Sequence, residues 1–123
     1  MNWKKIRLEL AGTSDHPRGS VSRGYLICAP LDESGVVDEE VLARAPHKAT
    51  VRRFWSTEPD EKGQLVRSDG HLALRCNGKA DRLLPLNGEL RLGARVDVVG
   101  ADGRALPFRI ASIAQLGREV LPS

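Results

Sequence analysis

Four dipeptides that accept a positive backbone φ angle fall within residues 69–103, and they constrain the fold more than any other feature of the chain. They are Asp69-Gly70, Asn77-Gly78, Asn87-Gly88 and Asp102-Gly103. Asp-Gly and Asn-Gly are preferred in the short turns of β-hairpins. Short runs rich in Val, Leu and Ile lie around them, so the second half of the chain is predicted to be an antiparallel β-meander.

The predicted meander contains short strands over residues 64–67, 71–76, 79–84, 90–92, 95–99 and 105–113. In 71–76, Leu72 and Leu74 share one face with Cys76, whereas His71 points to the other face. This alternation is typical of an antiparallel sheet that is covered on one side.

The first half of the chain adds two strands and a helix. Residues 4–10 alternate between an apolar face of Ile6, Leu8 and Leu10 and a face predicted to be wet, formed by Lys5, Arg7 and Glu9. Residues 25–29 are continuously apolar, which predicts a strand covered on both faces. Residues 38–45 are predicted to form a two-turn helix that Asp38 caps and Pro46 stops.

These elements predict an all-β protein, a small antiparallel β-barrel or strongly bent sheet of about 7–8 strands with one short helix. At 123 residues the chain fits one domain with a core of its own. We expect this domain to span residues 1–116 and residues 117–123 to form a C-terminal tail.

Several classes of function are disfavoured by the sequence. Residues 1–20 contain no apolar run of the kind that serves export or spans a bilayer, so a cytoplasmic protein without membrane contact is expected. Cys28 and Cys76 lack CxxC spacing and are predicted to be core thiols, and the three histidines are scattered. A Cys76 and His71 pair would lack a third, orienting group. We therefore expect no metal, no cofactor and no catalytic site.

The stretch "VRRFW" carries the main candidate binding residues. A strand over residues 50–56 sends Arg53 and Trp55 to one face and Arg52 to the other, with each arginine two residues from an aromatic ring. One hypothesis is structural: an aromatic fills the core and an arginine stem covers it. The other is a stacking platform for single-stranded nucleic acid. The chain has only five aromatic residues, which favours the structural hypothesis.

Residues 11–21 form a polar loop that is long for a hairpin and contains His16 and Arg18. This loop is predicted to be either a plain connection or a binding loop above a small-ligand pocket in the barrel mouth.

Several stretches resemble, in the same order, a family of small bacterial proteins of about this length. They are "KKIRLEL", "GSVSRGYLICAPL", "VRRFW" with "GQLV" following, and "PFRIASI". The family is uncharacterised, so the resemblance implies no activity, substrate or cofactor.

The functional prediction is therefore a non-catalytic binding or interaction module. The sequence does not identify its partner, and it leaves open both a protein partner and a second copy of the chain. The alternatives are weak binding of RNA or single-stranded DNA, and binding of a small ligand in the barrel mouth. A net charge of +3 allows polyanion binding but does not favour it.

Overall fold

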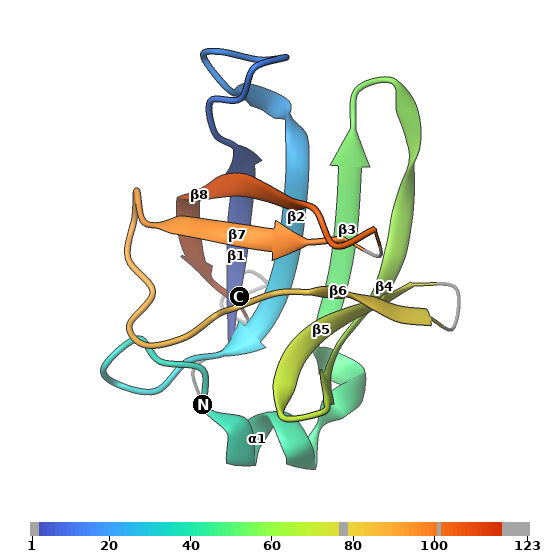
Figure 1. The fold of residues 1–123 in the computed structure, drawn as a ribbon. Coiled ribbons are helices and arrows are strands. Elements are labelled where there is room, and N and C mark those ends of the chain that lie inside the picture. Colours follow the sequence, from blue (N-terminus) through green and yellow to red (C-terminus); the bar gives the residue numbers. More distant parts are fainter. Residues whose placement is uncertain (1–2, 77–78, 101, 117–123) are drawn as a thin grey trace, which may run out of the picture.

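The computed structural model describes residues 3–76, 79–100 and 102–116, which form a closed antiparallel barrel of eight strands (Figure 1). The strands are β1 (Trp3–Leu10), β2 (Ser20–Pro30), β3 (Thr50–Trp55), β4 (Glu58–Ser68), β5 (His71–Cys76), β6 (Lys79–Leu83), β7 (Arg95–Val99) and β8 (Ala105–Gln115). One helix, α1 (Glu39–Arg44), and a 3-10 turn, Pro46–Lys48, separate β2 from β3. The predicted all-β barrel is confirmed.

Each strand pairs with the next along the chain, and β8 closes the barrel by pairing with β1. The joints differ in extent. β1 and β2 pair along all of β1, whereas β6 and β7 share only the pair Leu83 and Val99. The barrel therefore has one weakly joined seam. The predicted tail, residues 117–123, and the Asn77-Gly78 turn lie outside the described residues.

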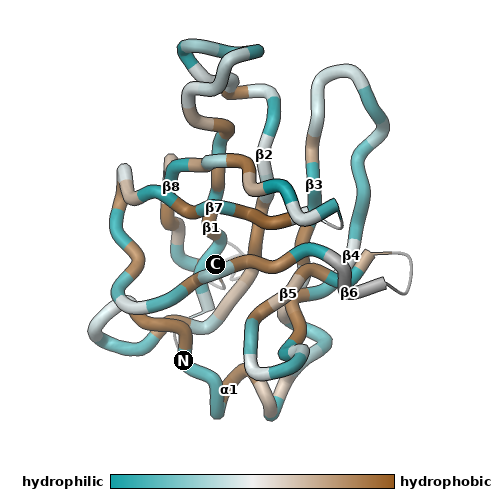
Figure 2. Tube along the Cα trace, viewed as in Figure 1, coloured by the Kyte–Doolittle hydropathy of each residue, from teal (hydrophilic) through white to brown (hydrophobic). Residues whose placement is uncertain are grey.

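The apolar face predicted for the first strand is the core. Ile6, Leu8 and Leu10 are each at most 2% exposed, and hydrophobic segments recur along the strands while the loop tips are hydrophilic (Figure 2). The opposite face is not fully exposed to solvent, because Glu9 is buried. Its carboxylate accepts hydrogen bonds from Arg7 at 2.8 Å and from Arg109 at 3.1 Å, which offsets the cost of burying a charge.

The Asp-Gly turn between β4 and β5 forms as predicted. Asp69 and Gly70 have φ angles of 51° and 80°, which is the left-handed conformation that a two-residue hairpin turn requires. Gly88 also has a positive φ of 67°, but no hairpin follows it. The predicted strand over 90–92 is wrong. This segment instead fixes Leu90 in the core through a hydrogen bond from its N–H to the carbonyl of Gly35.

β4 begins six residues earlier than the predicted strand over 64–67, at Glu58. Its first half is highly charged and shows no apolar alternation in the sequence. The first half of β4 is stabilised by pairing with β3 and by ion pairs to the arginines of β3. Charged residues therefore occupy a strand where composition favours a loop.

The two ends of the barrel are different. α1 lies at one end, where Leu42 is buried and the side chain of Asp38 caps the helix by accepting from the N–H of Val41. The loop after β1 and the tip of the β3–β4 hairpin project at the other end (Figure 1). No helix within the described residues is long and apolar enough to cross a membrane.

Candidate binding pocket in the mouth of the barrel

The strand register brings Arg53 between a tyrosine and a glutamate. On one side Arg53 is the cross-strand partner of Tyr25 in β2, and on the other side that of Glu61 in β4. Residues directly opposite on neighbouring antiparallel strands point to the same face. Arg53 therefore points into the barrel, on the same face as Tyr25, and its side chain is only 14% exposed.

The buried guanidinium is neutralised by carboxylates of β4. Arg53 donates to Glu58 at 2.9 Å and to Glu61 at 3.3 Å. Arg82 of β6 donates to the same Glu61 at 3.1 Å. We call Tyr25, Arg53, Glu61 and Arg82 the inner cluster. It contains two guanidiniums and one carboxylate, and Arg53 is also paired with the exposed carboxylate of Glu58.

Burial changes the acid–base behaviour of the inner cluster. It raises the pKa of the Tyr25 hydroxyl above its ordinary value of 10.0, and the nearby charges of Arg82 and Arg53 only partly oppose this. Burial disfavours the charged form of Arg82, but interactions with Tyr25 and Glu61 outweigh it and the pKa of Arg82 is raised. Both groups therefore keep their protons at neutral pH and can donate hydrogen bonds.

Trp55 lies next to the inner cluster and is enclosed by cations and rings. The guanidinium carbon of Arg53 is 4.4 Å from the centre of the indole, and that of Arg23 is 5.8 Å away. The ring centre of Phe108 is 6.5 Å from that of Trp55, in an edge-to-face arrangement. The indole is therefore packed among these groups and does not form an exposed platform along which successive bases of a strand could stack.

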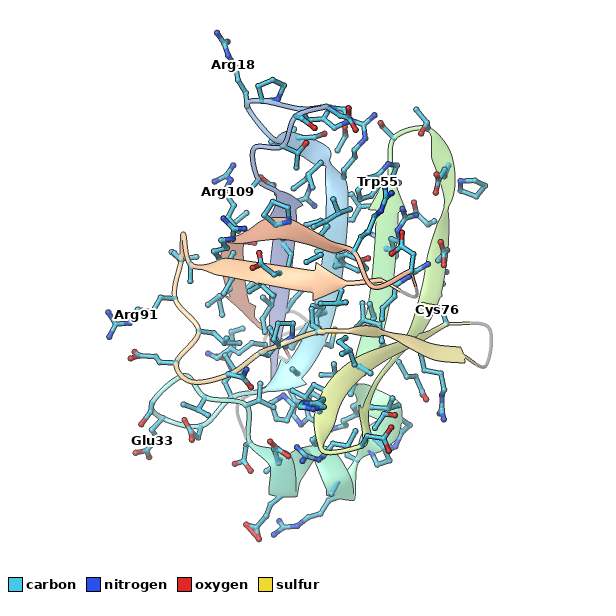
Figure 3. All side chains as sticks on the ribbon, viewed as in Figure 1. Arg18, Glu33, Trp55, Cys76, Arg91 and Arg109 are labelled. Carbon is cyan, nitrogen blue, oxygen red and sulfur yellow. The ribbon has the colours of Figure 1, made fainter. Side chains whose placement is uncertain are left out.

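Three members of the inner cluster line a pocket of about 300 Å³ together with Trp55 and Phe108, and we call it the mouth pocket. Tyr25, Trp55 and Phe108 form aromatic walls beside the guanidiniums of Arg53 and Arg82. The rim comes from the segment between β7 and β8 and from the start of β8, with Asp102, Arg104 and Leu106. Figure 3 shows Trp55 near the end of β3, beside this turn. Aromatic walls with a few convergent charged groups are typical of a ligand site.

The structure separates the residues predicted to bind. Arg53 and Trp55 line the mouth pocket, whereas Arg52 lies on the outer face of β3, where its Nε is 3.7 Å from a carboxylate oxygen of Asp60. Arg18 is exposed and extends from the tip of the loop after β1 (Figure 3), and His16 is half-buried in that loop. No residue of 11–21 is among the described residues that line the pocket.

Sequence reasoning missed most of the mouth pocket. Tyr25 stands in a continuous apolar run, which indicates burial but not a polar contact. Glu61 belongs to the charged start of β4, and Arg82 shows no distinctive pattern. The alternation in "VRRFW" is the only signal that leads to this site.

Within the described residues no group of three or more His, Cys, Asp or Glu side chains could hold a metal ion. Comparisons with protein-family models, with curated proteins and with solved structures give no match. The resemblance to small bacterial proteins therefore stays a prediction.

Proposed function

We propose that this protein is a non-catalytic binding module and that it takes a small ligand with an aromatic ring and a carboxylate into the mouth pocket. The observation that carries the proposal is the convergence of Arg53 and Arg82 with Tyr25, Trp55 and Phe108 around one opening. Guanidiniums bind carboxylates through paired, charge-assisted hydrogen bonds, and aromatic walls exclude water from a flat ring.

Two features of the inner cluster support an anionic ligand. Glu61 is shared between two guanidiniums, so the charge of the inner cluster is balanced only through the exposed Glu58 on Arg53. Nη1 of Arg82 is buried and has no hydrogen-bond partner in the described protein, although an unsatisfied buried donor is costly. A ligand carboxylate could also replace Glu58 on Arg53, because the Glu58 side chain is 52% exposed.

The test uses benzoate as the probe and benzamide as its neutral control of the same shape. Two-dimensional NMR follows the indole N–H signals of both tryptophans during the titration. We expect benzoate to shift the signal of Trp55 with a dissociation constant of about 1 mM or tighter, which is typical of a one-ring fragment. The Trp3 signal should not shift, because Trp3 is buried in the core and does not line the mouth pocket.

Charge recognition is tested by Arg82→Gln, with Arg52→Gln as the matched control on the outer face. Arg82→Gln should abolish the preference for benzoate over benzamide, and Arg52→Gln should keep it. Equal binding of the two probes by the unmodified protein, or shifts at Trp3 alone, would refute the proposal.

The protein partner or second copy predicted from the sequence, and the predicted cytoplasmic location, stay predictions that this site neither requires nor opposes. Sedimentation of the pure protein and fractionation of the source cells test them directly.

A further inference from the structure

The outside of the barrel carries a second charged surface, formed by strands β1 to β5. We call it the outer basic face and define it by Lys5, Arg7, Arg52, Lys62 and Arg75. The register places Arg7 opposite Leu26, Leu26 opposite Arg52, and Arg52 opposite Lys62, in one row across four strands. Adjacent strands are about 4.8 Å apart, so this row spans roughly 14 Å.

Two of these cations are poorly neutralised. Among the described residues, neither Lys5 nor Lys62 forms an ion pair, and both are exposed. Arg52 and Lys62 are like charges directly opposite each other, which is a destabilising arrangement in a sheet. Within the described part of the chain, the only acidic group paired with Arg52 is Asp60, at 3.7 Å. A bound anion would relieve this repulsion.

The same surface is hollowed. A depression of about 340 Å³ lies between Lys5, Arg52 and Lys62, and half-buried Leu26 and Cys28 are part of its lining. It lies on the outside of the sheet, whereas Arg53 and Trp55 point inward to the mouth pocket. The two sites are therefore independent surfaces of one barrel.

We propose that the outer basic face binds single-stranded nucleic acid, with phosphates on Lys5, Arg52 and Lys62 and a base over Leu26 and Cys28. Charge complementarity supports a polyanion, and the apolar hollow lies between the cations, where a base between two phosphates would sit. An acidic peptide that binds as an added strand needs a free sheet edge. β1, β2, β3 and β4 are each paired on both sides, so this face offers none.

The test measures fluorescence anisotropy of a labelled oligothymidylate over a salt series. The double variant Lys5→Ala/Lys62→Ala removes two exposed charges. We expect it to weaken binding about tenfold near physiological salt and to reduce the slope of log affinity against log salt by about 1.4, since each single-strand phosphate contact contributes about 0.7.

The matched control is Arg91→Ala/Arg95→Ala, which also removes two positive charges. Their side chains are 72% and 71% exposed and lie near β7, and Arg91 extends away from the barrel (Figure 3). The control should bind like the unmodified protein. Equal losses in both double variants, or unmodified binding weaker than about 10⁻⁴ M, would overturn the proposal.

A second readout locates the bound strand. Cys28 lines the hollow and Cys76 is buried, so the oligonucleotide should slow alkylation of Cys28 and leave that of Cys76 unchanged. Polyglutamate serves as an acidic protein mimic. If it displaces the oligonucleotide at equal charge concentration, the face recognises charge alone and the nucleic-acid proposal fails.

Discussion

The guanidinium of Arg53 lies 4.4 Å from the ring centre of Trp55, two residues along the same inward face of β3. The spacing in "VRRFW" predicts this contact for both arginines, but only one makes it. Phe54 is covered instead by Arg7 of β1, 4.5 Å from its ring centre, while Arg52 turns to Asp60. Adjacent arginines of one strand therefore have different roles.

This difference predicts unequal effects on stability. Arg53→Ala should lower the free energy of unfolding by about 2–3 kcal/mol, because it leaves Glu61 with one guanidinium and uncovers Trp55. Arg52→Ala should cost less than about 1 kcal/mol, since its ion pair is exposed on both sides. Urea unfolding of the two variants measures both values. Equal midpoints would contradict the inward position of Arg53.

The ionisation of Tyr25 is a second prediction, and it can be observed directly because Tyr25 is the only tyrosine. Burial raises its pKa, so the ultraviolet absorbance of tyrosinate should appear above pH 10 in the folded protein. In urea the midpoint should return to about 10. A folded-state midpoint at or below that of the unfolded chain would show that the hydroxyl is not buried.

The same shift fixes the sign of a pH effect on stability. A raised pKa means that the folded state holds this proton more tightly than the unfolded state. The contribution is complete below about pH 10 and is lost as the pH rises through the folded-state pKa. Tyr25→Phe removes this contribution, so it should have a flatter decline in stability above pH 10 than the unmodified protein.

The sequence predicts the strands whose residues alternate or are flanked by turn dipeptides. β1, β5 and β7 are found within one residue of their expected bounds, because apolar periodicity and Asp-Gly turns are local signals. The start of β4 could not be predicted in this way. Glu58 and Glu61 are held in a strand by arginines of β3, and such pairing depends on tertiary contacts.

The candidate site shows the same limit. Arg53 and Trp55 could be placed together from a period of two, but Arg82 joins them only when the barrel closes. The predicted loop residues His16 and Arg18 belong to a different part of the surface. Loop length indicates that a segment has room to bind, without indicating which pocket it faces.

A fourth prediction distinguishes the two cysteines. Cys28 is half-buried on the outer face, and Cys76 is buried. A thiol reagent should therefore modify Cys28 first in the native protein, and Cys76 only on the timescale of opening of the barrel. Mass spectrometry of timed samples separates the two sites, and both should react rapidly in urea. Faster native labelling of Cys76 would indicate that its strand opens locally.

The last prediction concerns the seam between β6 and β7. One residue pair, Leu83 with Val99, joins these strands, whereas β1 is paired along its length with both β2 and β8. Leu83 is also 39% exposed, so little apolar burial supports the joint. Local opening has the lowest free energy where few hydrogen bonds and few buried contacts must be broken. Hydrogen exchange followed by mass spectrometry should therefore show earlier exchange in peptides from 79–83 than in peptides from 3–10.

The reference peptide comes from the same chain, so differences in solution conditions cancel. Uniform protection of both segments would mean that the barrel opens only as a whole. In that case the segment 84–94, with buried Leu84, Leu86 and Leu90, stabilises the joint between β6 and β7 as much as strand pairing stabilises the other joints.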